Sequence, residues 1–167
     1  MTKFYIIGMP FSGKTTVGKK LAGMLGLAFF DSDRMLEEQF GIAIVDFFAK
    51  YGENRFREEE FLLREKLQSI KNAVIATGGG FPCFNNNMEF IRKNGKSIYL
   101  KAEPDMLIAR MKESKTTRPL LADSDFESQK NKMCRLLDER KFFYEQADFM
   151  LDAKNAISQF PILFQSL

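Results

Sequence analysis

A glycine-flanked segment from Gly8 to Thr15 restricts the possible folds of this chain more than any other part of the sequence. Its pattern is G-x-x-x-x-G-K-T, and the apolar run Phe4–Ile7 directly before it predicts a buried strand. Residues 15–25 carry apolar side chains at helical spacing. Strand, loop and helix in this order are the context in which the pattern forms a phosphate-binding loop, or P-loop. The context favours this prediction over a chance match in a glycine-containing turn.

The chemistry of such a loop follows from its backbone. Loop N–H groups and the N-terminus of the following helix attract a polyphosphate. Lys14 adds a positive charge near the outer phosphates, and the hydroxyl of Thr15 can bind Mg²⁺. We expect Lys14 to lie on a solvent-facing loop, outside the core.

Apolar, β-favouring runs recur along the chain with helical patterns between them. This alternation predicts an α/β fold, a three-layer α/β/α arrangement around a five-stranded parallel sheet. Polar or glycine-rich clusters follow the first three runs, and the carboxyl ends of parallel strands are where ligands bind in open α/β sheets. The runs are Phe4–Ile7, Leu27–Phe30, Ala73–Ala76, Ser97–Leu100 and Phe149–Leu151.

Composition excludes several classes of protein. The 167 residues predict one domain, residues 1–167. The absence of histidine rules out Ser-His-Asp triads and His-ligated zinc. A net charge of +3 gives no argument for nucleic acid, and no apolar run is long enough for a membrane helix. With no secretory signal and two cysteines at no metal or redox spacing, Cys83 and Cys134, we expect a cytoplasmic protein with reduced thiols.

Two carboxylates follow the second apolar run, in Phe30-Asp31-Ser32-Asp33. If the chain stays extended, Asp31 and Asp33 share one side of it beside the P-loop. One carboxylate can serve Mg²⁺ and the other can bind a substrate hydroxyl. The alternative is helix capping by Ser32 or Asp33, which is compatible with a functional role.

The clearest helical pattern runs from Glu53 to Ile70. Glu60 falls on its apolar face, where a carboxylate is costly unless it is paired. Arg57, three residues earlier, is within reach, so we expect a partly buried Arg57–Glu60 pair that turns Arg57 toward a ligand. The alternative is an ordinary surface pair. Gly78-Gly79-Gly80 indicates close approach of backbone to a ligand, or else a tight turn before Pro82.

Residues 115–124 have the polar flanks and central proline of a surface loop, and loops of this length are often lids. Arg118 on this loop could swing over the phosphates, and Arg140 could grip a carboxylate with two hydrogen bonds. The alternative for each arginine is a solvated surface position. A long charged helix is predicted over 127–144, and a terminal helix over 155–167 that is broken or kinked at Pro161.

Taken together, these residues resemble the shikimate kinase family, and the similarity extends from Lys3 to about Asp152. The P-loop alone is generic, whereas the other blocks are more specific. The blocks are residues 8–18, Phe30-Asp31-Ser32-Asp33, residues 47–60 with Phe56-Arg57 and Glu60, Gly78-Gly79-Gly80, Arg118-Pro119-Leu120-Leu121, and Glu139-Arg140-x3-Tyr144.

The resemblance implies transfer of the γ-phosphate of ATP to the 3-hydroxyl of shikimate, on the route to chorismate and the aromatic amino acids. It implies Lys14, Asp33 and Arg118 as catalytic residues, and Thr15 and Asp31 as ligands of Mg²⁺. Residues implied for ATP are Phe11, Ser12, Gly13, Lys14, Thr15, Thr16, Arg110 (near adenine) and Arg118. Residues implied for shikimate are Asp33, Phe48, Phe56, Arg57, Gly78, Gly79, Gly80 and Arg140. We expect a monomer that binds these small molecules, and neither nucleic acid nor membrane.

The sequence departs from the family pattern at Phe142 and Phe143, where the family usually has Pro and Leu, which puts the aim of Arg140 in question. Lys154 matches the family's terminal basic residue only loosely. Two other hypotheses remain open at this point. One is a P-loop kinase for another small acceptor, such as gluconate or a nucleoside monophosphate. The other is a regulatory NTPase that uses nucleotide as a switch.

Overall fold

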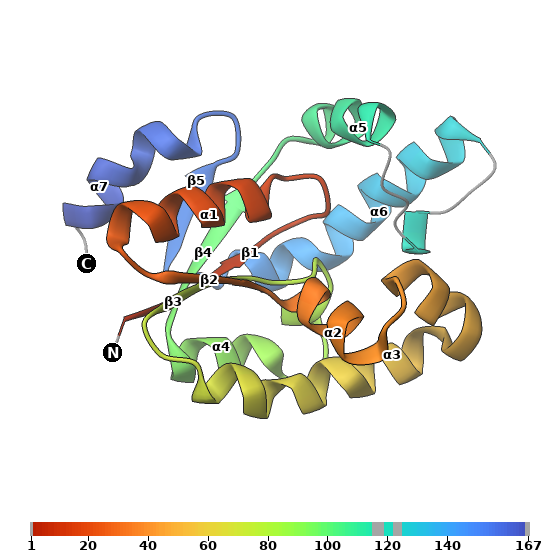
Figure 1. Ribbon diagram of the computed structural model, residues 1–167. Coiled ribbons are helices and arrows are strands. Elements are labelled where there is room, and N and C mark those ends of the chain that lie inside the picture. Colours follow the sequence, from red (N-terminus) through yellow and green to blue (C-terminus); the bar gives the residue numbers. More distant parts are fainter. Residues whose placement is uncertain (1, 115–118, 122–124, 166–167) are drawn as a thin grey trace.

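The computed structural model describes residues 2–114, 119–121 and 125–165 (Figure 1). Its centre is a sheet of five parallel strands in the order β2-β3-β1-β4-β5. The predicted strand positions are confirmed, with ends shifted by one residue at most. The strands are β1 (Lys3–Ile7), β2 (Ala28–Asp31), β3 (Ala73–Ala76), β4 (Lys96–Lys101) and β5 (Phe149–Asp152).

Helices cover both faces of the sheet, so the predicted three-layer α/β/α arrangement is confirmed. Helices α1 and α7 lie above the sheet in the view of Figure 1, and α3 and α4 lie below it. The α-helices are α1 (Lys14–Leu25), α2 (Ser32–Phe40), α3 (Ile44–Ser69), α4 (Asn87–Asn94), α5 (Pro104–Glu113), α6 (Phe126–Tyr144) and α7 (Phe160–Gln165). Short 3₁₀ helices are η1 (Phe81–Cys83), η2 (Pro119–Leu121) and η3 (Ala156–Gln159).

The interior strands β1 and β3 are buried over their whole length, as their unbroken apolar sequences predict for a sheet covered on both faces. The register pairs Ile6 of β1 and Asp31 of β2 with Ala76 of β3. The three strands therefore end side by side. Their following segments, which begin at Gly8, Ser32 and Thr77, emerge at one edge of the sheet.

The structure corrects two of the predicted helices. Helical structure begins at Ile44, nine residues before the predicted start, and is interrupted at Gly52, where φ is 78° and ψ is 172°. Residues with a side chain rarely adopt these backbone angles. Glycine adopts them without steric cost, so Gly52 can join the two helical pieces. The C-terminal segment changes from η3 to α7 just before Pro161, which sits in the first turn of α7, where its missing N–H costs no helical hydrogen bond.

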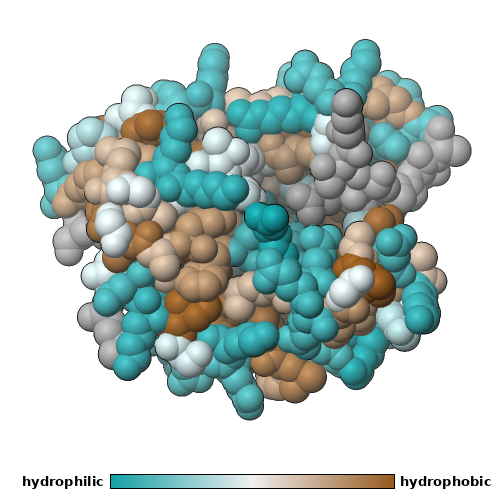
Figure 2. Space-filling view, viewed as in Figure 1, coloured by the Kyte–Doolittle hydropathy of each residue, from teal (hydrophilic) through white to brown (hydrophobic). Residues whose placement is uncertain are grey.

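Among the described residues, no helix combines the length and the apolar character needed to cross a membrane. Figure 2 shows hydrophilic side chains over much of one face, with hydrophobic side chains in smaller groups between them.

Candidate active site

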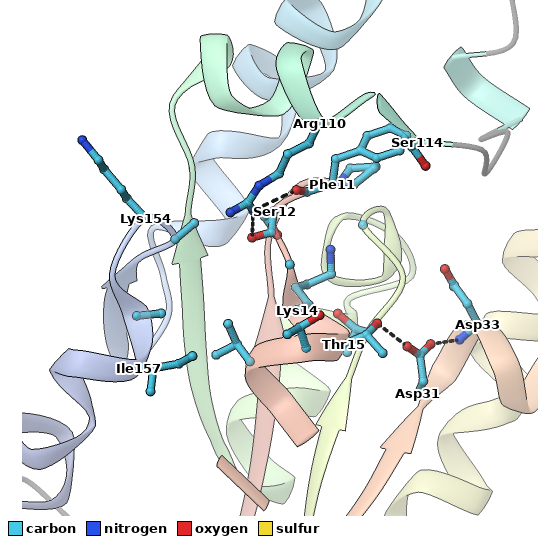
Figure 3. A pocket seen from close by; sticks show the side chains of 18 of the residues that line it. Phe11, Ser12, Lys14, Thr15, Asp31, Asp33, Arg110, Ser114, Lys154 and Ile157 are labelled. Atoms are coloured by element: carbon cyan, nitrogen blue, oxygen red, sulfur yellow. Dashed lines mark hydrogen bonds between the residues drawn. The ribbon is translucent and has the colours of Figure 1, made fainter. Parts of the chain in front are cut away.

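A cavity of about 1010 Å³ opens at the edge of the sheet where β1, β2 and β3 end (Figure 3). The P-loop and the start of α1 form one wall of it. Its lining includes every described residue that the resemblance implies for ATP or metal: Phe11, Ser12, Gly13, Lys14, Thr15, Thr16, Asp31 and Arg110. Asp33 and Gly79 also line it.

The P-loop owes its shape to unusual backbone angles. Gly13 caps α1 with a φ of 98°, in the left-handed region, which glycine adopts without steric cost. Phe11 has a φ of 65°, an uncommon value for a residue with a side chain. The motif predicts the glycine but gives no sign of the strained phenylalanine.

Lys14 is buried, so the prediction that it lies on a solvent-facing loop is wrong. Its ammonium group donates hydrogen bonds to the carbonyl oxygens of Gly8, at 2.9 Å, and Met9, at 2.7 Å. These contacts satisfy a charge that would be costly to bury alone. They also hold the ammonium against the loop on which a polyphosphate would lie.

Thr15 and Asp31 meet directly at the start of α1, since the Thr15 hydroxyl donates a 2.7 Å hydrogen bond to Asp31 Oδ2 (Figure 3). This pair offers one hydroxyl and one carboxylate oxygen. Mg²⁺ prefers oxygen ligands and takes few from the protein when phosphates supply others. The donor set fits the predicted metal.

The two aspartates do not share one side of an extended chain as predicted. Asp31 ends β2 and caps α2, because its side chain accepts hydrogen bonds from the N–H groups of Asp33 and Arg34. The capping residue is therefore Asp31, not Ser32 or Asp33. Asp33 lies in the first helical turn, and this turn directs it toward both cavities of the site.

Arg110, in the last turn of α5, also lines the larger cavity. Its guanidinium donates hydrogen bonds to the carbonyl oxygens of Phe11, at 3.2 Å, and Ser12, at 2.7 Å. Residues 153–158 form another wall of this cavity, and the sequence did not predict them as part of the site. Lys154 belongs to this wall, but Figure 3 shows its side chain directed away from Lys14 and Thr15. Only the apolar character of Ala153, Ala156 and Ile157 could have suggested a wall there.

A second, smaller cavity of about 60 Å³ adjoins the first. Pro10, Asp33 and Gly79 line both cavities. The smaller one is lined by every residue that the resemblance implies for the acceptor: Asp33, Phe48, Phe56, Arg57, Gly78, Gly79, Gly80 and Arg140. Two aromatic rings from the two pieces of α3, Phe48 and Phe56, pack together at 4.7 Å between centroids.

The predicted Arg57–Glu60 pair is confirmed and is buried, with Arg57 Nη1 2.6 Å from Glu60 Oε2. Glu53, which the sequence analysis did not include, also accepts from Arg57 Nη2 at 2.7 Å. Burial raises the pKa of Glu60 to about 7; the charge of Arg57 opposes this shift, and Asp33 adds to it. Glu60 Oε1 has no hydrogen-bond partner among the described residues. The pair therefore keeps Arg57 at the cavity, and the cost is a buried carboxylate with one oxygen that has no partner among the described residues.

The triple glycine is explained by space rather than by a turn that requires positive φ. A Cβ at Gly78 would lie 2.4 Å from Asp33 Oδ1, and one at Gly80 would lie 2.6 Å from Arg57 Nη2. At Gly79 it would lie 2.8 Å from Pro10 Cδ and 3.3 Å from Arg140 Nη1. Real Cβ contacts essentially never fall below 3.0 Å. Missing side chains here let these protein groups approach the backbone, and a turn closed by the hydrogen bond from Phe81 N–H to the Gly78 carbonyl forms before Pro82, so close approach to a ligand stays a prediction.

Arg140 is buried and lines the smaller cavity, although Phe142 and Phe143 replace the usual Pro-Leu pair. Helix α6 runs through both phenylalanines to Tyr144, and Phe142 is 72% exposed. The departure thus leaves Arg140 facing the site. Arg118 and most of the predicted lid, 115–124, lie outside the described residues; the Pro119–Leu121 turn lines the smaller cavity.

Comparisons with known proteins show the family of this chain. A model of the family described as SKI: Shikimate kinase matches residues 10–161. A shikimate kinase of Azobacteroides pseudotrichonymphae is 40% identical over 155 residues, which cover 92% of this chain and 91% of that protein.

Solved structures give the same result. The shikimate kinase from Bacteroides thetaiotaomicron superimposes with a TM-score of 0.90 at 31% identity, covering 98% of both chains. The shikimate kinase from Acinetobacter baumannii, solved in complex with shikimate, gives a TM-score of 0.90 at 33% identity, covering 99% of this chain and 94% of that one. A gluconokinase from Sinorhizobium meliloti shares only the fold, with a TM-score of 0.57 at 15% identity. This chain belongs to the shikimate kinase family.

Proposed function

We propose that this protein transfers the γ-phosphoryl group of ATP to the 3-hydroxyl of shikimate, giving shikimate 3-phosphate for aromatic biosynthesis. The single observation that carries the proposal is the pair of adjoining cavities that share Asp33, Pro10 and Gly79. One contains a phosphate-binding loop and the other contains two buried arginines beside a carboxylate. This arrangement suits a phosphate donor and a hydroxylated carboxylic acid as acceptor.

In the smaller cavity, Arg57 and Arg140 bind the carboxylate of shikimate. Both are buried in the walls, and hydrogen bonds to a charged group are stronger where water is excluded. Asp33 binds the acceptor hydroxyl and orients it toward the larger cavity. The backbone at Gly79 contacts the ring substituents, while Phe48 and Phe56 pack against the ring.

In the larger cavity, the amides of Phe11, Ser12 and Gly13 and the side chain of Thr16 bind the phosphates. Lys14 moves from the carbonyl oxygens of Gly8 and Met9 to the transferring phosphoryl group. Thr15 and Asp31 hold Mg²⁺, which neutralises charge on the phosphates when it is bound. Because positioning and charge stabilisation dominate phosphoryl transfer, a site without histidine is sufficient.

The remaining parts of the proposal rest on the sequence and the family. Residues 1–167 form one kinase domain, and 115–124 form a lid that brings Arg118 to the phosphates. Arg110, anchored to the P-loop, lies beside the adenine. The protein works as a cytoplasmic monomer without nucleic acid or membrane partners.

The test is a panel of acceptors offered to the wild-type protein with ATP and Mg²⁺. Shikimate, gluconate, a nucleoside monophosphate and water are compared by ADP formation, and the product is identified by ³¹P NMR. We expect rapid ADP formation with shikimate alone and a phosphate ester at its 3-position. ADP formation at the same rate without an acceptor would favour a nucleotide switch, and a faster reaction with another acceptor would replace shikimate.

A further inference from the structure

Tyr144, the last residue of α6, lies behind the active site and lines neither cavity. Its side chain is completely buried and stacks on Tyr99 of β4, with 5.2 Å between ring centroids. Its hydroxyl donates a 2.6 Å hydrogen bond to the carbonyl oxygen of Gly79 and lies 3.6 Å from the sulfur of Met9. One hydroxyl thus contacts the triple glycine and the P-loop.

Arg140 lies one helical turn earlier and reaches the same glycine, since a Cβ on Gly79 would lie 3.3 Å from Arg140 Nη1. Burial raises the pKa of Tyr144, while the neighbouring guanidinium acts to lower it. A tyrosine hydroxyl has one proton to donate and lone pairs to accept with. Because it donates its proton to the Gly79 carbonyl, the hydroxyl keeps its lone pairs for the donors of a neighbouring guanidinium. Among the described residues no ion pair of Arg140 is found, in contrast to Arg57, which has two glutamates.

The contact with Gly79 has a geometric consequence for the cavity. The peptide between Gly79 and Gly80 is planar and trans, so fixing the carbonyl of Gly79 also fixes the direction of the N–H of Gly80. Among the described residues, no hydrogen bond is donated by the N–H groups of Gly79 and Gly80, and both residues line the smaller cavity. Without side chains, these residues have little else to hold their conformation.

We propose that Tyr144 is a positioning residue for the acceptor: its hydroxyl holds Arg140 and the Gly79–Gly80 peptide in the geometry that binds shikimate. The proposal rests on the proposed function for the identity of the acceptor. The contact with Met9 is weaker, because a thioether is a poor acceptor, so the effect on ATP is small.

The experiment compares Tyr144→Phe with Tyr99→Phe. Tyr144→Phe keeps the stacked ring and removes only the hydroxyl. Tyr99→Phe removes a hydroxyl from the other ring of the same stack, where the neighbouring charges are Glu145 and Glu103 rather than Arg140. In Tyr144→Phe we expect the KM for shikimate to rise about three- to tenfold, the scale for loss of one neutral hydrogen bond. The KM for ATP stays within about twofold, and both constants are unchanged in Tyr99→Phe.

A second readout does not depend on the acceptor. The order parameter of the Arg140 Nε–H bond, measured by NMR relaxation in the protein without ligands, falls in Tyr144→Phe and not in Tyr99→Phe. An unchanged order parameter, or a lower melting temperature with both KM values unchanged, would overturn the positioning role and leave a structural one. If Arg140 loosens as expected but the wild-type protein does not phosphorylate shikimate, the positioning of Arg140 stands and the proposed acceptor is wrong.

Discussion

The two cavities of the site are built in different ways. The larger one is shaped mainly by backbone: eight consecutive residues from Pro10 to Val17 form its phosphate-binding wall, and even Lys14 is held by carbonyl oxygens. The smaller one is shaped by side chains from α2, α3, η2 and α6, packed around the glycine backbone that follows β3. Its charged groups hold one another, as in the contacts of Arg57 with Glu53 and Glu60.

This difference predicts how substitutions in each cavity affect catalysis and acceptor binding. A backbone loop keeps its shape when one side chain changes, so substitutions there should remove chemistry and leave binding of the acceptor intact. A network of buried charges depends on each member, because an unpaired buried charge is costly. Substitutions in the smaller cavity should therefore disturb acceptor binding even where they touch no acceptor atom.

Lys14→Ala should have the largest effect. Its ammonium lies against the P-loop, and loss of one preorganised electrostatic contact costs roughly 10²–10³ in kcat. We expect turnover with shikimate to fall by at least that factor in steady-state assays. Because Lys14 is buried, circular dichroism and the melting temperature are the controls for folding. Turnover within a few-fold of wild type would remove Lys14 from the catalytic residues.

Gly80→Ala tests the smaller cavity through space alone. The backbone of Gly80 is right-handed helical, with φ −85° and ψ −16°, so alanine fits the backbone without strain. The new methyl group would lie 2.6 to 2.8 Å from the guanidinium atoms of Arg57 and must displace them. Losing a charged hydrogen bond to the acceptor should raise the KM for shikimate roughly tenfold to 100-fold, with the KM for ATP unchanged.

Gly23→Ala is the matched control for this substitution. Gly23 lies in α1, and a Cβ there would meet nothing within 4 Å. Alanine in a helix should stabilise the protein by about 0.5–1 kcal/mol and leave both KM values alone. If Gly80→Ala also left the KM for shikimate alone, Arg57 would not bind the acceptor from the position it occupies here.

Glu60→Gln should have the smallest effect and tests the cost of the charge network. The pKa of Glu60 rises from 4.5 to about 7 on folding because burial outweighs the attraction of Arg57. The folded state then binds the proton more tightly than the unfolded chain. The protonated Glu60 therefore adds to the free energy of unfolding. This contribution is complete below pH 4.5 and is lost as pH rises through about 7.

The measurement is the difference in unfolding free energy between wild type and Glu60→Gln, from urea titrations at several pH values. The difference should shift against the wild type by on the order of 1–3 kcal/mol between the unfolded and folded pKa values, and stay constant above them. A flat difference would mean that Arg57 fully offsets burial, and a shift in favour of the wild type would mean that Arg57 outweighs burial.

The contrast between a contiguous loop and contacts among distant elements also explains which features the sequence predicts. The strands, the P-loop and helix α1 are encoded by contiguous residues, and they are confirmed. The pairing of Arg57 with Glu60 could be predicted because both residues lie on one helix at a spacing of three residues. Glu53 and the contacts of Tyr144 with Gly79 and Met9 were missed.

Contacts between distant elements leave no local pattern. Residue offsets along a helix describe neighbours on that helix, whereas Tyr144 and Met9 meet only because α6 packs behind the P-loop. The burial of Lys14 was missed for a related reason. The carbonyl oxygens of Gly8 and Met9 hold Lys14, and every residue type has such an oxygen, so no residue type in the motif signals the contact.

The most direct test of the account is calorimetric titration of Lys14→Ala with shikimate. If the side chain of Lys14 serves the chemistry and not the acceptor cavity, this variant, inactive in turnover, should bind shikimate with an affinity within about threefold of wild type, less than the value of one hydrogen bond. A tenfold or greater loss of shikimate affinity in a folded Lys14→Ala protein would contradict the account, because the side chain of Lys14 would then support the acceptor site.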